Sequence, residues 1–281
     1  MIIEKGIKKL VVGTVDPNPR VCGKGIKKCK DAGIEVITGV LENECRKLNE
    51  IFFQYQMWQL GQAEKKPFVA IKTATTTDGK IAAKTGSSKW ITSEKSRKEV
   101  QKLRNKYDAI LTGSNTVIID NPSLTCRMKN GRNPIRIIID SELKTTPDFN
   151  VYKDDGTKVY IAVSENISDK KTALFGENVR FIKCPLKNNK IDLKFLFGKL
   201  YEAGLCSILV EAGGGLNGAL LKENLIDKVY QFIAPKILAD KDGCGWAEGF
   251  DIKDINESVQ MRIETVKRIG ADVFVEYSFI E

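Results

Sequence analysis

The stretch best suited to holding a phosphorylated ligand is VEAGGGLNGA, from Val210 to Ala219. An apolar strand leads into three glycines and then into a helical pattern, so backbone amides at the start of that helix can approach a phosphate closely. The spacing is not the GxGxxG fingerprint that opens a Rossmann unit, and a lone glycine cluster is a weak signal. Glu211, at the end of the strand, either faces a ligand or caps the turn.

A second candidate is the polar stretch of residues 72–90, KTATTTDGKIAAKTGSSKW, which leaves a predicted strand. Loops at the carboxyl ends of strands are where open α/β sheets bind ligands. Asp78 and Gly79 suit a turn, the hydroxyls can contact a cofactor, and Trp90 can stack on a flat ring. The alternative is a surface turn with a buried tryptophan.

A third candidate is residues 112–127, TGSNTVIIDNPSLTCR, which also follows a predicted strand. It combines Thr116, Asp120, an Asn-Pro turn and Arg127. A guanidinium beside amides and hydroxyls suits a phosphate or carboxylate clamp. Taken alone, such a stretch is more often only a loop.

Composition excludes several kinds of chemistry. The chain of 281 residues has no histidine, which removes Ser-His-Asp, Cys-His and histidine-ligated metal mechanisms. Its 45 basic and 36 acidic residues give a net charge of +9, which favours an anionic partner. There is no run of five basic residues, no zinc-finger spacing and no aromatic and basic RNA-binding signature. Phosphorylated small molecules are therefore favoured over nucleic acid.

The cysteines and the apolar segments indicate a cytoplasmic protein. The seven cysteines, at positions 22, 29, 45, 126, 184, 206 and 244, form no CxxC pair, as expected for reduced thiols. The amino terminus has charges scattered through a short apolar stretch and does not resemble a signal peptide. No apolar run approaches the roughly 18 residues of a membrane span. We therefore expect no membrane partner.

The elements that would position these loops alternate between strand and helix, which predicts an α/β protein. The predicted strands are Lys9 to Val15, Ile34 to Val40, Phe68 to Thr73, Ala109 to Thr112, Ile135 to Asp140, Val159 to Val163, Val179 to Ile182 and Ser207 to Glu211. Helices are predicted at Ser93 to Tyr107, capped by Ser93, and at Asp192 to Ala203, ended by Gly204.

The two ends of the chain differ from its middle. Val229 to Leu238 and Met261 to Phe279 are β-rich, and a hairpin is predicted at Arg268 to Asp272, so we expect antiparallel strands at one edge of a mostly parallel sheet. Near the other end, the helix-like segment Glu42 to Leu60 gives way to the polar GQAEKK. A boundary is predicted at Gly61 to Pro67, after about 60 residues, which is small for an autonomous domain.

Four stretches in order resemble a known family: TATTTDGKIAAKTGSSKWITSEKSR, TVIIDNPSLTCR, IRIIIDS and VEAGGGLNGALL. They are similar to the reductase domain of the bifunctional RibD family of riboflavin biosynthesis, which is related to dihydrofolate reductase. The resemblance spans roughly Pro67 to the carboxyl terminus. It implies a mostly parallel mixed sheet with helices on both faces and carboxyl-terminal antiparallel strands. It also makes a homodimer or homotetramer plausible.

The resemblance further implies an activity. In the family, NADPH reduces the ribosyl group of 5-amino-6-(5-phosphoribosylamino)uracil to a ribityl group, by hydride transfer to the sugar C1 carbon. Both ligands carry phosphates, which suits the basic chain. Two alternatives stay open: another dihydrofolate-reductase-like NADPH reductase, and a non-enzymatic nucleotide-binding or RNA-binding protein.

The segment GIKKLVVGTVDPNPRVCGKGIKKCKDAGIEV resembles the last part of the family's amino-terminal cytidine-deaminase-like domain. The HxE and PCxxC zinc motifs of that domain are absent, and Cys22, Cys29 and Cys45 do not restore them. We therefore expect residues 1–62 to be a truncated deaminase-like remnant, residues 67–281 to be the reductase domain, and the chain to have neither catalytic zinc nor deaminase activity.

The site residues implied by the resemblance fall into three groups. Lys72 and Glu211 are expected to flank the reacting sugar as catalytic residues, although Lys72 is alternatively only a structural partner of Glu211. The expected substrate contacts are Ser88, Arg104, Leu124, Arg127 and Glu211, with the two arginines on the anionic end of the substrate. The expected cofactor contacts are Ala74, Trp90, Thr116, Asp120, Ser141, Gly213, Gly214, Gly215, Leu216, Asn217, Gly218 and Ala219. No metal ligand is expected, and no basic group is singled out for the cofactor's 2′-phosphate.

Overall fold

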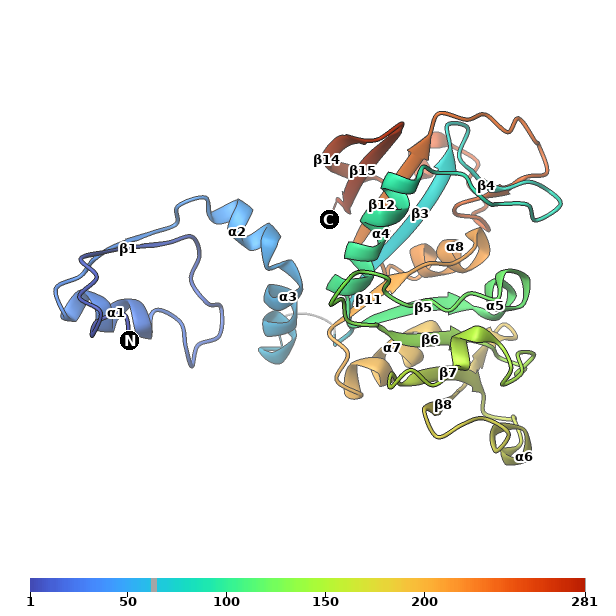
Figure 1. Ribbon diagram of the computed structural model, residues 1–281, viewed down its shortest axis with the longest axis horizontal. Helices are drawn as coiled ribbons and strands as arrows, with labels where there is room; N and C mark the ends of the chain where they lie inside the picture. Colours follow the sequence, from blue (N-terminus) through green and yellow to red (C-terminus); the bar gives the residue numbers. More distant parts are fainter. Residues whose placement is uncertain (62–64, 281) are drawn as a thin grey trace. The chain divides into compact units, whose positions relative to one another are not determined.

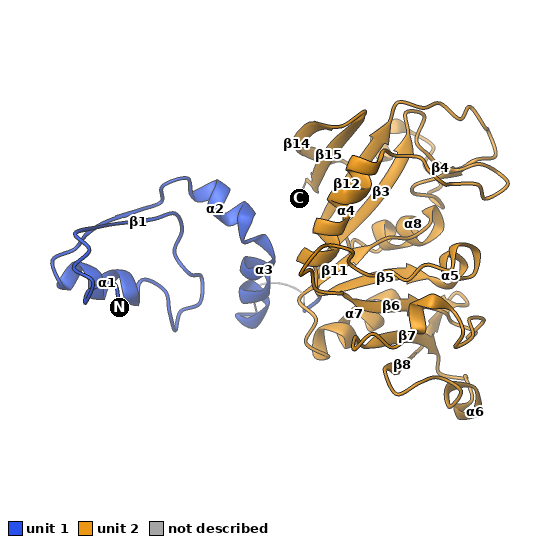
Figure 2. Cartoon of the chain, viewed as in Figure 1, with its two compact units in different colours: residues 1–66 blue, residues 67–281 orange. Residues whose placement is uncertain are grey.

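The computed structural model describes residues 1–61 and 65–280, so residues 62–64, within the predicted boundary, lie outside the described part. The chain divides into two compact units, Met1–Lys66 and Pro67–Glu281 (Figure 2). None of the described helices is long and apolar enough to cross a membrane.

The first unit is small and built around one pair of parallel strands. Its elements are β1 (Lys9–Val12), α1 (Lys24–Asp31), β2 (Glu35–Thr38), α2 (Glu42–Leu48) and α3 (Glu50–Gln59). The helix expected over Glu42 to Leu60 is therefore two helices, because Asn49 leaves helical geometry with φ −108°. In a sheet of only two strands both faces are poorly covered, and Val11 and Ile37 are exposed.

The second unit is organised around a nine-stranded sheet of described residues (Figure 1). Its order is β14-β15-β12-β3-β11-β5-β6-β7-β8. The bounds are β3 (Phe68–Thr76), β5 (Ala109–Gly113), β6 (Ile135–Ile139), β7 (Val159–Ser164), β8 (Val179–Cys184), β11 (Ser207–Val210), β12 (Lys228–Ala234), β14 (Met261–Ile269) and β15 (Asp272–Phe279). Strands β12 to β8 are parallel, whereas β14 and β15 are antiparallel. The predicted mixed sheet with an antiparallel edge is confirmed.

Helices cover both faces of this sheet, as the sequence predicts. Side chains alternate along β3, so Val69 and Ile71 face one side, where they share a core with α7 (Leu193–Glu202) and α8 (Gly214–Lys222). Phe68 faces the other side and meets Tyr107, at the end of α4 (Glu94–Lys106), with ring centroids 6.4 Å apart. The two helices predicted from periodicity, α4 and α7, are both confirmed.

Ser93 fixes the start of α4, as predicted, and a buried carboxylate fixes Ser93. The Ser93 hydroxyl accepts the Ser96 amide at 3.4 Å. Asp272, the first residue of β15 and only 2% exposed, accepts from the Ser93 amide at 2.8 Å, the Ser93 hydroxyl at 2.7 Å and the Ser96 hydroxyl at 2.5 Å. The predicted carboxyl-terminal hairpin is confirmed, and Asp272 ties it to α4.

Other segments depart from the sequence prediction. Strand β3 continues three residues past the predicted end at Thr73, so Ala74 lies within it; a turn at Gly79 then leads to β4 (Lys80–Ala82), which pairs with β13 (Cys244–Gly245). Part of the loop expected at residues 112–127 is a helix, α5 (Ser114–Asp120). The unpredicted short elements are η1 (Asn150–Tyr152), α6 (Asp169–Thr172), β9 (Leu186–Lys187), β10 (Lys190–Ile191) and η2 (Ile255–Glu257).

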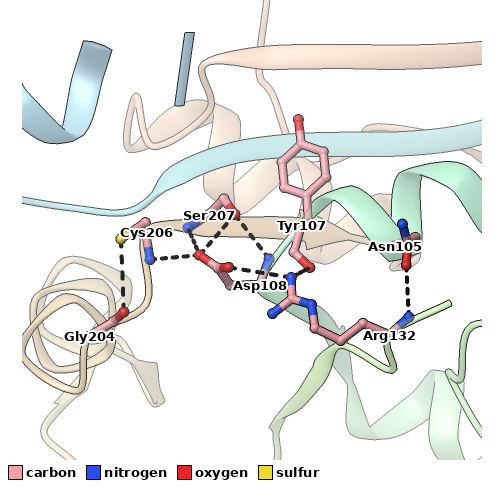
Figure 3. Close-up of polar contacts among 7 residues, drawn as sticks. All are labelled: Asn105, Tyr107, Asp108, Arg132, Gly204, Cys206 and Ser207. Atoms are coloured by element: carbon pink, nitrogen blue, oxygen red, sulfur yellow. Dashed lines mark hydrogen bonds and ion pairs between the residues drawn. The ribbon is translucent and has the colours of Figure 1, made fainter. Parts of the chain in front are cut away.

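A side-chain cluster at the amino ends of the strands sets the register of β5 against β11 (Figure 3). Asp108 accepts from the amides of Cys206 and Ser207, both at 3.1 Å, and exchanges hydrogen bonds with the Ser207 hydroxyl. Arg132 donates to the Tyr107 carbonyl at 3.0 Å and lies 3.5 Å from the second Asp108 oxygen. These contacts keep the two strands in register from their first residues.

Removing this carboxylate should destabilise the fold. In Asp108→Ala the two strand amides and the Ser207 hydroxyl lose their acceptor, and the expected loss in free energy of unfolding is about 2–3 kcal/mol by urea denaturation. Glu202→Ala, which removes an exposed carboxylate of α7, is the control and should change it by less than ~0.5 kcal/mol. Equal effects of the two substitutions would refute a role for Asp108 in strand register.

Candidate active site

A cleft of about 680 Å³ opens at the carboxyl ends of β5, β6 and β11. Its size lies within the range of small-molecule and cofactor sites. The lining is Gly113, Ser114, Asn115, Thr116, Ile139, Ser141, Lys187, Asn188, Lys190, Ile191, Leu193, Gly213, Gly215, Leu216, Ala219, Lys222 and Glu223. Six of the expected cofactor contacts are among these residues: Thr116, Ser141, Gly213, Gly215, Leu216 and Ala219.

The first turn of α8 presents free amides at one end of this cleft. Gly213 is the N-cap, with no side chain to cap the helix. The first intrahelical bond is donated by the Asn217 amide to the Gly213 carbonyl, so the amides of residues 214–216 have no acceptor among the described residues. Together with the positive end of the helix dipole, these amides suit the phosphates of a nucleotide.

The glycines of this loop divide into two kinds. A Cβ at Gly213 or Gly215 would meet open space, whereas a Cβ at Gly214 or Gly218 would overlap the backbone carbonyls of Gly245 and Glu248 respectively. Gly214 and Gly218 therefore let the segment of residues 244–248 lie against α8.

Asn217 belongs with the packing glycines. It is fully buried and donates to the Trp246 carbonyl at 2.7 Å. Gly214, Asn217 and Gly218 thus lie outside the cleft lining, although all three were expected as cofactor contacts. The structure shows these three residues packed against a neighbouring segment, the Gly214 amide is still one of the free amides of the first turn, and a cofactor contact stays a prediction for all three.

Three charged side chains meet just beside the glycine loop. Glu211, next after β11, accepts from Arg104 of α4 through both carboxylate oxygens, at 2.8 Å from Nε and 3.0 Å from Nη2. Lys72 of β3 has its Nζ 3.6 Å from the same carboxylate. The three side chains are only 12–17% exposed. The contact between the expected catalytic residues is therefore an ion pair, and Glu211 does not cap the turn.

The pair with Arg104 fixes the charge state of Glu211. Burial raises the pKa of this carboxyl, but Arg104 and then Lys72 outweigh burial and hold the pKa at about 2. For Arg104, burial lowers the pKa and Glu211 outweighs it, so the net shift is upward. Glu211 is ionised at neutral pH and is no proton donor there.

Arg104 uses three of its five N–H donors within the protein. Its Nη1 donates to the Thr125 carbonyl at 2.9 Å, in addition to the two bonds to Glu211. The sequence predicts Arg104 at the anionic end of the substrate; in the structure its guanidinium bonds to Glu211 and to Thr125, and the substrate contact stays a prediction. Arg127, by contrast, is exposed, and its guanidinium has no polar contact with a described residue.

Trp90 and Ser88 lie by a second hollow, of about 400 Å³, together with Thr76 and Lys236. Trp90 is 63% exposed, so the alternative of a buried tryptophan is wrong. The Arg97 guanidinium lies 4.5 Å from the centre of its ring. An exposed ring held on one face by a cation leaves the other face for a flat ligand.

Three further expected contacts, Asp120, Leu124 and Ala74, do not line the main cleft. Asp120, at the end of α5, pairs with Lys89 at 3.2 Å and so links α5 to the loop before Trp90. Leu124 is buried in the core beside Val117, with a left-handed φ of 53°. Ala74 lies two residues after Lys72 on the same face of β3.

The sequence did not predict the polar and charged residues at the far end of the cleft. Lys187, Asn188 and Lys190 come from the β9–β10 hairpin, and Lys222 and Glu223 from the end of α8. The signal was present in KNNK, since two asparagines between extended residues favour a tight hairpin. Among the described residues, no group of three or more Cys, Asp or Glu side chains could hold a metal ion.

The mixed sheet and the cleft at its carboxyl edge define an α/β protein of the dihydrofolate-reductase-like class. A profile of the RibD C-terminal domain family matches residues 67–275. The chain belongs to this family.

Two curated relatives cover almost the whole chain. It is 38% identical over 283 aligned residues to the riboflavin biosynthesis protein RibD of Actinobacillus pleuropneumoniae, covering 100% of this chain and 73% of that protein. It is 39% identical over 276 residues to RibD of Aquifex aeolicus, covering 98% and 73%.

Solved structures agree. The diaminohydroxyphosphoribosylaminopyrimidine deaminase/5-amino-6-(5-phosphoribosylamino)uracil reductase of Thermotoga maritima matches with a TM-score of 0.81 and 36% identity, over 99% of this chain and 73% of that one. RibD of Acinetobacter baumannii matches with a TM-score of 0.80 and 28% identity, over 100% and 75%.

The charge state of Glu211 predicts a pH-dependent stability. The pKa of Glu211 is about 2 in the folded protein and near 4.5 in the unfolded chain. The ionised carboxylate therefore stabilises the fold fully above pH 4.5, and this stabilisation is lost as the pH falls towards 2. The difference in unfolding free energy between the wild type and Glu211→Gln should therefore shrink by ~2 kcal/mol between pH 7 and pH 3. Urea denaturation of both proteins at each pH measures it. A constant difference would contradict an ionised, paired Glu211.

The two kinds of glycine predict opposite outcomes for the same substitution. Gly218→Ala places a methyl group on the Glu248 carbonyl and should lower the melting temperature strongly. Gly215→Ala has open space and a helical position, where alanine is favoured by about 1 kcal/mol, so stability should hold or rise. Its methyl group should instead weaken nucleotide binding. Thermal melts of both variants measure the effect on packing, and nucleotide titrations measure the effect on binding. Similar losses of melting temperature in the two variants would refute the division of the glycines into two kinds.

Proposed function

We propose that this chain is the NADPH-dependent reductase of riboflavin biosynthesis that converts the ribosyl group of 5-amino-6-(5-phosphoribosylamino)uracil into a ribityl group. The observation that carries the proposal is the adjacency of two sites: Glu211, paired with Lys72, is separated from Gly213 of the cleft by one residue. A dinucleotide in the cleft would reach the charged pair with one end. The names of the relatives that cover the chain support the same activity.

The lining of the cleft fits a phosphorylated dinucleotide. Unpartnered amides of α8 suit the pyrophosphate, and open space beside Gly213 and Gly215 lets it approach closely. Thr116 and Ser141 add hydroxyls. NADPH, when bound, supplies a hydride to the substrate; the residues of this chain orient the reactants and handle the protons.

Lys72 is suited to supply the proton that the reaction consumes. The sugar C1 becomes electrophilic when the ribosylamine ring opens to an imine, with a proton moving to the ring oxygen. Hydride addition at C1 then requires a second proton, at the nitrogen. We propose that the Lys72 ammonium donates this proton and is afterwards reprotonated by solvent. Glu211, held ionised by Arg104, orients Lys72 and can accept a hydrogen bond from a sugar hydroxyl.

We assign the substrate's phosphate to Arg127, because its guanidinium is exposed and has no polar contact with a described residue. Ser88 and Trp90 are proposed as contacts for the substrate and the cofactor respectively. Arg104 is proposed as a positioning residue. Leu124 is proposed as an apolar contact for the substrate.

The remaining proposals concern the whole chain. We propose that residues 1–62 correspond to the end of a deaminase-like domain, since the Thermotoga maritima deaminase/reductase matches 99% of this chain and the reductase family profile matches only residues 67–275. A cytoplasmic location is supported by seven free thiols. A homodimer or homotetramer would have a natural association edge in β14, which ends the sheet with Ile263 and Val266 exposed.

The activity and the role of Lys72 are tested together. Lys72→Ala should lower kcat by about 100-fold or more with little change in KM, because a proton donor acts in the transition state. NADPH oxidation with the ribosylaminouracil phosphate is followed by absorbance. Lys98→Ala, which removes an exposed lysine of α4, is the control.

Three outcomes would overturn parts of the proposal. Unchanged turnover with only a raised KM would leave Lys72 as a structural partner of Glu211. A wild-type rate abolished by chelator would contradict a metal-free reaction. Salt-sensitive RNA binding without NADPH binding would replace the enzyme by a binding protein.

A further inference from the structure

The cleft carries more positive charge at the far end of α8 than pyrophosphate binding at the start of that helix explains. Three lysines line it, Lys187, Lys190 and Lys222, against one carboxylate, Glu223. Lys222 donates one of its three N–H groups to the Gly249 carbonyl, which holds its ammonium against the main chain. The two lysines of the β9–β10 hairpin are more available to an anion, because neither ammonium donates to a main-chain carbonyl of a described residue.

The hairpin brings these two lysines together by its geometry. Asn188 and Asn189 both have left-handed φ, 52° and 59°, as a two-residue type I′ turn requires. The register then places Lys187 directly opposite Lys190, with both side chains on one face. Like charges in this position repel each other, so a bound anion between them would be stabilising.

The two lysines differ in how far the protein neutralises them. Lys187 lies 3.3 Å from Glu223 and is 60% exposed. Lys190 is exposed and makes no ion pair or hydrogen bond with a described residue. Both charges thus remain accessible, and only one is partly compensated.

The hairpin is held rigidly, which keeps the lysines in place. Ile191 is buried in the main core. Asp192 follows it, with its amide donating to the Pro185 carbonyl at 3.0 Å and its carboxylate capping α7 through the Phe195 amide at 3.0 Å. An anion bound here would not have to order the loop, so little affinity would be lost.

We propose that Lys187 and Lys190 recognise the 2′-phosphate on the cofactor's adenosine ribose and thereby set a preference for NADPH over NADH; this rests on the proposed function. From Gly214 to Lys222, α8 rises by roughly 12 Å, too far for one phosphate to contact both ends. The amides of the first turn suit the pyrophosphate, with the nicotinamide towards Glu211. The hairpin then lies at the adenosine end, where the second anionic group of NADPH is found.

Glu223 reduces the affinity of this site for an anion. Its carboxylate neutralises Lys187 and would repel a phosphate, while one of its oxygens is buried without a hydrogen-bond partner among the described residues. Glu223→Gln frees Lys187 and removes the repulsion. It should therefore strengthen binding of the 2′-phosphate, and weaker binding would overturn the assignment.

The test is titration of the full chain with adenosine 2′,5′-bisphosphate and with 5′-AMP, which differ only in the 2′-phosphate. In Lys190→Ala, and more strongly in the double variant with Lys187→Ala, the dissociation constant for the bisphosphate should rise about tenfold to a hundredfold, with 5′-AMP nearly unchanged. Lys190→Arg should retain binding. Lys194→Ala, an exposed lysine of α7 outside the cleft lining, is the matched control.

Steady-state constants for NADPH and NADH separate the two levels of the proposal. The hairpin variants should raise the KM for NADPH and leave that for NADH unchanged. Equal losses for both cofactors, or no loss for either while the wild type still oxidises NADPH, would defeat the hairpin site alone. A wild type that binds neither nucleotide and oxidises no NADPH would defeat the proposed function as well.

Discussion

The active end of this protein depends on one buried carboxylate and the two cations that hold it. Glu211 follows directly after a central strand, where burial opposes its charge, yet Arg104 and Lys72 keep it ionised. Removing either partner of such a group leaves an uncompensated charge, so the three side chains act as a unit. They come from three separate elements, β11, α4 and β3, which means that the sheet and one helix must assemble before the site exists.

The two edges of the sheet differ in role: contacts at the amino ends of the strands stabilise the fold, and the binding residues lie at the carboxyl ends. At the amino ends of the strands, the Asp108 carboxylate bonds β5 to β11, and the Asp227 carboxylate accepts a hydrogen bond from the Val69 amide at 2.7 Å. At the carboxyl ends lie Lys72, Glu211 and the glycine loop, as expected for a parallel sheet. Substitutions at the first edge should act on stability, whereas those at the second should act on binding and turnover and, at Glu211 and Gly218, on stability as well.

Local pattern was sufficient to predict the fold, because strand and helix periods and caps are encoded by neighbouring residues. The capped helix after Ser93, the hairpin at Arg268 to Asp272 and the mostly parallel sheet with an antiparallel edge followed from it, whereas the order of the strands did not. It failed where tertiary contacts decide. Nothing local separates Gly214 and Gly218, which pack on the 244–248 segment, from the glycines that face the cleft.

The same limit applies to charge. The net charge of +9 favoured phosphorylated ligands, but the sequence singled out no basic group for the cofactor's 2′-phosphate. Placement came from a two-residue turn that sets Lys187 opposite Lys190 at the mouth of a cleft. Arg104 shows the converse: a guanidinium expected at the substrate gives three of its five N–H donors to Glu211 and the Thr125 carbonyl. Whether a basic residue binds a ligand therefore depends less on its position along the chain than on which acceptors the fold has already given it.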